Sequence, residues 1–284
     1  MSSQAITPEL RDWIVAQARA GCRPEDVLQS MRTSGWDEDT ALDALETTLQ
    51  EYLAAQQKPA ETLPPAVPVP EPDLSSNAGV VRALDRPVEV LMAMRSPRLI
   101  VFGGLLSDDE CEQMIALAKP RLARSETVDK VSGGSEVHEA RTSDGMFFER
   151  GEHALIGLIE RRIAALLNWP VENGEGLQVL RYRPGAEYKA HHDYFDPAQP
   201  GTPTILQRGG QRVGTLVTYL NTPPRGGGTA FPDVGVEVGA MRGNAVFFSY
   251  DRAHVATRTL HAGMPVLEGE KWVATKWLRE REFK

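Results

Sequence analysis

Cysteine is scarce in this chain of 284 residues, because only Cys22 and Cys111 occur and they lie in different regions. A cysteine-based metal site is therefore excluded, and a disulfide framework is not expected. Basic residues are also outnumbered, since 31 Lys and Arg stand against 39 Asp and Glu and leave a formal net charge of −8. That balance argues against nucleic acid and other polyanions as partners.

Long hydrophobic runs are missing as well. No segment approaches the ~20 apolar residues that a membrane-spanning helix needs, and residues 1–5 lack the pattern with which a signal peptide is expected to begin. We therefore expect no membrane partner, and the few cysteines favour a cytoplasmic protein. With 41% hydrophobic and 25% charged residues, the chain is ordinary for a globular protein of one large and one small domain.

Proline is concentrated in one segment, residues 56–77, where it recurs at nearly alternate positions. Such a run cannot build a helix or a sheet ladder, and it is typical of an extended, semi-rigid spacer of polyproline character. We therefore expect a linker between two modules, residues 1–55 and residues 78–284, with few contacts between the modules.

Residues 1–55 have the pattern of three short helices. Thr7 followed by proline is typical of a helix start, and apolar residues then recur at helical spacing. A second helix is predicted from Pro24 to near Gly35, and Asp37 can cap a third. In size and pattern the module resembles a small ubiquitin-associated-type bundle. It is then either a binding domain for a protein partner or a packing or solubility appendage without one.

The second module is expected to begin with helical segments and to continue as short strands. Ser107 opens a capping box before a helix to about Lys119, and a second helical pattern stops before Pro170. Beyond residue 177 the chain consists of β-branched and aromatic runs separated by Gly and Pro, namely 177–182, 213–220, 245–249 and 272–278. Helices followed by many short strands predict an α+β domain organised around a jelly roll.

The segment around His191 and Asp193 carries the strongest functional signal. In an extended segment, residues i and i+2 project from the same face, so both side chains reach one metal ion. His261 supplies a second imidazole far along the chain. Two imidazoles and one carboxylate are the ligand set of a mononuclear non-haem iron(II) site with open coordination positions. His192 would point to the opposite face and is not expected to bind the same metal.

Several separated motifs follow one another between residues 98 and 282. They are residues 141–145 (RTSDG), 175–180 (EGLQVL), 209–213 (GGQRV), 226–232 (GGGTAFP) and 271–272 (KW). With the His-x-Asp segment they make this region similar to the catalytic domain of the 2-oxoglutarate- and iron(II)-dependent prolyl 4-hydroxylases of bacterial type. The resemblance implies a double-stranded β-helix, a cupin-like jelly roll with supporting helices. It also implies that Fe(II) is held by His191, Asp193 and His261.

The same resemblance assigns the co-substrate contacts. Lys271 would hold the far carboxylate of 2-oxoglutarate, and the hydroxyls of Tyr182, Thr215 and Tyr219 would contact the same molecule. A lysine between apolar strand residues agrees with this role, because an anion would offset its desolvation. The alternatives are a solvent-facing lysine on an edge strand and three core hydroxyls with internal partners.

The resemblance also implies a peptide groove near the metal. Its residues would be Arg141, Ser143, Glu175 and Arg212, with Tyr188 and Trp277 near the target residue. Arg212 could instead pair with a surface carboxylate, and Trp277 could belong to the strand core. Where similar enzymes usually carry a histidine after the final Trp-Leu or Trp-Ile pair, this chain has Arg279, which points to a different peptide preference.

The implied reaction is hydroxylation of peptidyl proline, at the 4-position, with conversion of 2-oxoglutarate and O2 to succinate and CO2. Ascorbate is a further expected cofactor, and a proline-containing peptide or protein is the expected substrate. Two other function classes stay open. One is an oxygenase acting on a free amino acid or small metabolite, and the other is a non-catalytic, cupin-like binding protein. The complete ligand set together with Lys271 argues against the last of these.

Overall fold

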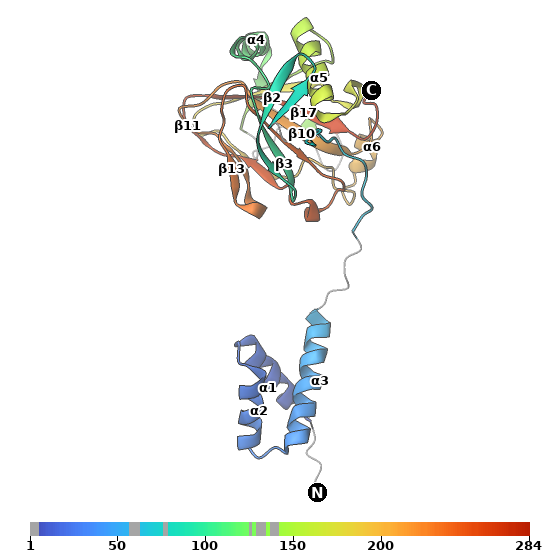
Figure 1. Ribbon diagram of the computed structural model, residues 1–284, viewed down its shortest axis with the longest axis vertical. Helices are drawn as coiled ribbons and strands as arrows, with labels where there is room; N and C mark the ends of the chain where they lie inside the picture. The colour runs from blue at the N-terminus through green and yellow to red at the C-terminus, as the bar shows by residue number, and fades with distance from the viewer. Residues whose placement is uncertain (1–5, 57–62, 76–78, 125–126, 129–134, 137–141) are drawn as a thin grey trace. The chain divides into compact units, whose positions relative to one another are not determined.

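The computed structural model describes residues 6–56, 63–75, 79–124, 127–128, 135–136 and 142–284 (Figure 1). It divides the chain into two compact units, Met1–Leu63 and Pro64–Lys284. None of the helices in the described segments is long and apolar enough to cross a membrane.

The described part of the first unit consists of three helices, α1 (Pro8–Arg19), α2 (Pro24–Thr33) and α3 (Glu38–Gln56). Two predicted caps are present, because Thr7 Oγ1 accepts a 3.4 Å hydrogen bond from Leu10 N and Asp37 Oδ2 a 3.3 Å one from Thr40 N. The helices share a core of their own, made of Ile14, Val27, Met31, Ala41, Ala44 and Leu45. The predicted three-helix pattern is confirmed.

The second unit contains a large antiparallel sheet with the strand order β1-β2-β3-β14-β10-β17-β8-β7-β4. The strand bounds are β1 (Val80–Ala83), β2 (Arg86–Met94), β3 (Arg98–Gly103), β4 (Ala123–Arg124), β7 (Asp144–Phe148), β8 (Leu177–Tyr182), β10 (Arg212–Tyr219), β14 (Ala245–Ser249) and β17 (Lys271–Arg279). The four predicted strand runs therefore agree with β8, β10, β14 and β17 to within a residue at each end.

The expectation that this unit begins with helices is wrong, because β1, β2 and β3 precede its first helix. These strands are consecutive neighbours, with Val81 paired to Val88 and Val90 to Phe102. Exposed residues recur along β2, as in a half-buried strand. Pro87 is one of these exposed residues, and proline within a run weakens the sequence signal for a strand.

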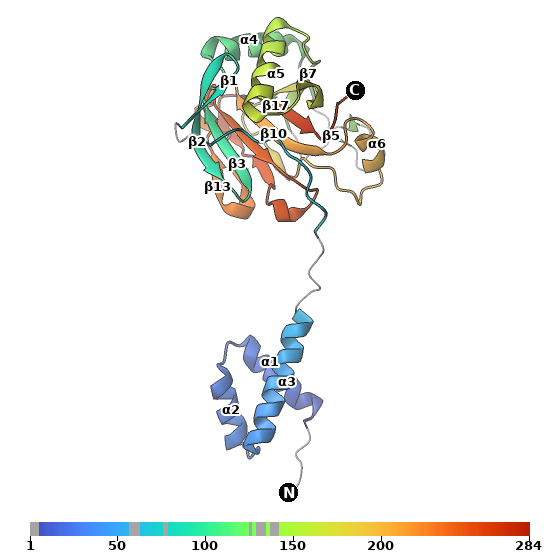
Figure 2. The same ribbon diagram turned by 45° about the vertical axis from the view of Figure 1, so that its right-hand side comes forward.

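Helices α4 (Asp108–Ala118) and α5 (Ala154–Leu167) pack on one face of the large sheet (Figure 2). The predicted capping box at Ser107 is present, and α5 ends before Pro170 as predicted. A short helix, α6 (Thr202–Leu206), follows β9 along the chain. The helices thereby cover one face of the sheet and leave its other face for the second layer.

Strand β17 separates the helix-covered core from a pocket. Trp272, Ala274 and Leu278 belong to the core beneath the helices. The intervening residues line the pocket on the other face, namely Lys271, Val273, Thr275 and Trp277. Side chains alternate between the two faces of a strand, and both faces of β17 lie inside the protein, so every residue of β17 is buried.

A smaller antiparallel sheet, of order β13-β12-β15-β9, forms the second layer. Its strands are β9 (Tyr188–His191), β12 (Thr229–Phe231), β13 (Val236–Val238) and β15 (His261–Gly263). Two further ladders join β11 (Arg225–Gly226) to β16 (Val266–Glu268) and β5 (Thr127–Val128) to β6 (Ser135–Glu136). The pocket has lining residues from both sheets, so it lies between the two layers of the predicted jelly roll.

Residues 64–75, which we call the proline strap, belong to the second unit. Val67 N donates a 2.8 Å hydrogen bond to the carbonyl of Asp251, and Glu71 N donates a 2.9 Å one to that of Leu167. Pro70 is buried, and a Cβ on Gly214 of β10 would lie 3.2 Å from its ring. The predicted linker, residues 56–77, therefore includes a segment that packs on the second unit.

Candidate active site

The predicted metal ligands meet through strand pairing in the small sheet. His191 ends β9 and His261 begins β15, and the two residues are direct partners in the antiparallel ladder. Asp193 lies two residues beyond β9. One ligand atom from each of the three lies within 4.8 Å of the others. The ladder therefore joins residues that are 70 positions apart in the sequence.

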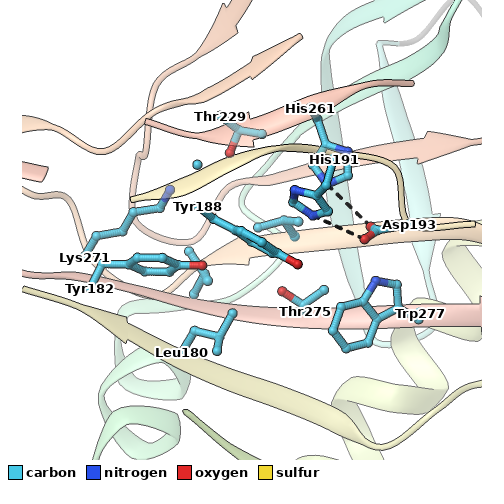
Figure 3. A pocket seen from close by; sticks show the side chains of 13 residues that line it. Leu180, Tyr182, Tyr188, His191, Asp193, Thr229, His261, Lys271, Thr275 and Trp277 are labelled. Carbon is cyan, nitrogen blue, oxygen red and sulfur yellow. Dashed lines mark ion pairs between the residues drawn. The ribbon is translucent and has the colours of Figure 1, made fainter. Parts of the chain in front are cut away.

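Each imidazole is held by a backbone carbonyl. Nδ1 of His191 lies 2.8 Å from the Lys189 carbonyl oxygen, and Nδ1 of His261 lies 3.0 Å from that of Thr259. A carbonyl only accepts, so each Nδ1 carries the hydrogen and each Nε2 presents a lone pair. Both Nε2 atoms lie 3.5 Å from an oxygen of Asp193 (Figure 3). This donor set, oriented by its neighbours, fits a divalent iron ion.

The charge states suit metal binding. Burial alone would raise the pKa of the Asp193 carboxyl, but the imidazoles of His261 and His191 hold that pKa well below its usual range. Burial lowers the pKa of His261 to about 4, and the neighbouring His191 ring adds to the effect. At neutral pH Asp193 is therefore a carboxylate and His261 a neutral imidazole, the forms that coordinate metals.

Lys271 lies at the far end of the pocket from Asp193 (Figure 3). Its side chain is buried, and its ammonium donates a 3.4 Å hydrogen bond to the Gly228 carbonyl. Among the described residues no carboxylate forms an ion pair with it, and burial alone lowers its pKa to about 8. An anion reaching from the metal to this end of the pocket would offset that desolvation, so the site fits a dicarboxylate that also binds the metal.

Comparison with known proteins agrees with this arrangement. Residues 177–279 match the model of the 2OG-Fe(II) oxygenase superfamily. Prolyl 4-hydroxylase 2 of Arabidopsis thaliana is 37% identical over 69% of this chain and 72% of its own length. Prolyl 4-hydroxylase 1 of the same plant is 42% identical over 66% of this chain and 70% of its own. This chain belongs to the prolyl 4-hydroxylase family of 2OG-Fe(II) oxygenases. It is a 2-oxoglutarate-dependent dioxygenase.

A solved structure is similar as well. The viral collagen prolyl hydroxylase of Paramecium bursaria Chlorella virus-1, determined as a 2OG complex, is 31% identical with a TM-score of 0.50. The similarity covers 64% of this chain and 95% of the viral one. The 2OG oxygenase fold predicted from the motifs is therefore confirmed for this dioxygenase.

The three predicted co-substrate hydroxyls of the dioxygenase lie in different places. Tyr182 lines the pocket and pairs with Lys271 across β8 and β17. Thr215 instead donates a 2.8 Å hydrogen bond to Asp193. Tyr219 donates a 2.8 Å hydrogen bond to Thr229, and Thr229 itself lines the pocket. Thr229 lies in the glycine-rich motif 226–232, but no sequence argument singled it out.

Four of the six predicted substrate residues form two groups. Tyr188 and Trp277 line the pocket, and the Tyr188 ring stacks on His191 with 3.7 Å between ring centroids. Ser143 is fully buried just before β7. Arg141 lies outside the described residues. Tyr188 and Trp277 therefore share one pocket with the predicted metal ligands.

Glu175 and Arg212 form the second group, a buried ion-pair cluster. Arg212 donates to both carboxylate oxygens of Glu175, at 2.6 and 2.9 Å. Arg279 donates a 2.7 Å hydrogen bond to the same carboxylate and a 2.6 Å one to the Gly210 carbonyl. The Arg212 guanidinium lies 4.0 Å from the centre of the Trp277 ring. The cluster thus supports the pocket wall at Trp277, and Arg279 takes part in it.

Proposed function

We propose that this dioxygenase hydroxylates proline in a peptide, at the 4-position, and converts 2-oxoglutarate and O2 to succinate and CO2. We assign His191, Asp193 and His261 as the ligands of Fe(II), and Lys271 as the anchor of the far carboxylate of 2-oxoglutarate. The observation that carries this proposal is that the three ligands and Lys271 line one pocket between the two sheets.

The bound iron, with 2-oxoglutarate and dioxygen, supplies the oxidising power. The protein's part is to position groups and to exclude water. His191 and His261 present their Nε2 lone pairs because backbone carbonyls hold their Nδ1 hydrogens. Apolar side chains complete the pocket walls between the metal ligands and Lys271, namely Leu180, Val217 and Val273. These walls keep the charge of the ammonium poorly screened for an incoming anion.

Peptidyl proline is proposed as the substrate because the similar proteins are named prolyl 4-hydroxylases and a collagen prolyl hydroxylase. Tyr188 and Trp277 offer aromatic surface beside the metal site, and such surface suits the compact, apolar ring of proline. The aromatic pair therefore supports the substrate class, and the relatives support the position hydroxylated.

The test is mass spectrometry of proline-containing peptides incubated with the protein, Fe(II), 2-oxoglutarate and ascorbate. We expect a gain of one oxygen on proline, with equal amounts of succinate, and loss of both when 2-oxoglutarate is omitted. Free proline is assayed in parallel. Hydroxylation of free proline without any peptide product would overturn the peptide assignment and favour a metabolite oxygenase.

We also propose that the helical unit Met1–Leu63 binds a protein partner. Its support is a core that the unit forms by itself from α1, α2 and α3. A recognition role of this kind does not require contact with the pocket, because a tethered module raises the local concentration of whatever it binds.

A further inference from the structure

Asp193 differs from the two histidines in how its orientation is held. Each histidine is fixed by a carbonyl two residues away in its own segment. Asp193 lies beyond the end of β9, so the sheet ladder does not hold its backbone. Its oriented contact comes from another strand, through the hydroxyl of Thr215 on β10.

The direction of the hydrogen bonds follows from the charge of Asp193. An ionised carboxylate only accepts, so the single hydroxyl hydrogen of Thr215 goes to Asp193 Oδ2 at 2.8 Å. The hydroxyl of Tyr250 lies 2.9 Å from the same Thr215 oxygen. Since the Thr215 hydrogen is already used, Tyr250 must be the donor in this second bond. The order of donation is therefore Tyr250 to Thr215 to Asp193.

The surroundings of Tyr250 keep its hydroxyl in place as the donor to Thr215. It is 2% exposed, and burial raises its pKa well above the ordinary value, so its hydroxyl stays protonated. Its backbone N donates a 3.1 Å hydrogen bond to the Val213 carbonyl of β10. Its ring meets that of Tyr194, the residue after Asp193, edge-on at 6.1 Å between centroids. Both the hydroxyl and the ring thus support the segment that carries the metal ligand.

We propose that Tyr250 is a positioning residue that fixes the Asp193 carboxylate for metal binding, acting through the hydroxyl of Thr215. This inference rests on the proposed metal ligands. Without the Tyr250 hydroxyl, the Thr215 oxygen loses its buried donor, and the bond to Asp193 alone is left to orient the Thr215 hydroxyl. Partners of this kind around metal ligands typically change metal affinity by about 10- to 100-fold.

The test is anaerobic titration calorimetry of the metal-free, full-length protein with Fe(II). We expect Tyr250→Phe to raise the dissociation constant about tenfold and Thr215→Val to raise it at least as much, while Thr215→Ser stays near wild type. The double variant should be no weaker than Thr215→Val alone, because both changes break one chain. Tyr194→Phe is the matched control and should bind Fe(II) as wild type does.

The thermal midpoint of the metal-free protein separates positioning from general stability. If Tyr250 has only a structural role, Tyr250→Phe should lower the thermal midpoint and leave Fe(II) affinity unchanged, and this result would overturn the proposal. Additive losses of Fe(II) affinity in the double variant would overturn it as well. If Tyr250→Phe does not fold, the comparison of Thr215→Val with Thr215→Ser decides whether Fe(II) affinity depends on a hydroxyl at position 215. His191→Ala tests the ligands themselves, so unchanged Fe(II) binding there would reject the proposed metal site rather than the role of Tyr250.

Discussion

Lys271 combines full burial with an ammonium that lacks an ion-pair partner among the described residues. We predict that Lys271→Met raises the apparent KM for 2-oxoglutarate about ten- to a hundredfold, because a charge-assisted contact of about 1.5 to 3 kcal/mol is lost. Fe(II) affinity without 2-oxoglutarate should be unchanged. Steady-state succinate production measures KM, and Lys119→Met, an exposed lysine outside the pocket, serves as the control. An unchanged KM would assign the anchor to another group.

The same lysine predicts a pH dependence. Burial lowers its pKa to about 8 in the protein without co-substrate, and the dianion binds the protonated form. Affinity for 2-oxoglutarate should therefore be constant below pH 8 and fall as the pH rises above it, by about tenfold per unit. Calorimetry at several pH values measures this. The same pH series on Lys271→Met should be flat in this range, and a decline of equal steepness there would assign the titration to a different group.

Arg279 illustrates a residue whose role depends on its neighbours. Sequence alone marked it only as a departure from the usual histidine, and the structure places it against Glu175 beside Arg212. Burial alone would raise the pKa of Glu175, but the guanidiniums of Arg212 and Arg279 hold it below its usual range. One carboxylate therefore serves two buried cations.

We predict that Glu175→Gln destabilises the protein by about 3 to 5 kcal/mol, because two buried guanidiniums lose their shared counter-charge. Denaturant unfolding of the metal-free protein measures the loss. Glu172→Gln, on the neighbouring 3-10 helix and largely exposed, is the control. A stable Glu175→Gln protein with impaired peptide hydroxylation would instead show that the carboxylate serves the substrate directly.

At the scale of elements, the proline strap belongs to the second unit. Its backbone bonds to Asp251 and Leu167, and Pro70 packs beside Gly214, the residue before Thr215. Glu71 also forms an ion pair with Arg98 of β3. The strap therefore packs on β10 beside the residue that bonds Asp193, and it is also joined to β3.

We predict that a protein starting at residue 77 is less stable than one starting at residue 63. The shorter protein loses two backbone hydrogen bonds and buried proline surface, together worth about 2 to 4 kcal/mol. Thermal unfolding of the two truncated proteins measures the difference. Equal thermal midpoints would show that the proline strap does not stabilise the second unit and acts only as a spacer.

At the scale of the whole molecule, the two units have separate cores. We predict that removing residues 1–62 leaves the thermal midpoint of the catalytic unit and its turnover of a short proline peptide unchanged within about twofold, because none of the described residues of the removed segment lines the pocket. Parallel assays on the full-length and shortened proteins check this. Loss of turnover on the short peptide would make the helical unit part of the catalytic core.

The sequence by itself determined the local elements and the chemistry. Caps, periodicity and strand runs depend on neighbouring residues, so α1 to α5 and the four central strands were predictable, and so was the cluster of His191, Asp193 and His261. The tertiary structure decided what depends on contacts between distant segments. It brought Tyr250 to Thr215, Arg279 to Glu175 and the strap to β10. No local pattern encodes such pairs, because hydrogen-bond partners and buried charges are chosen by sheet register and packing.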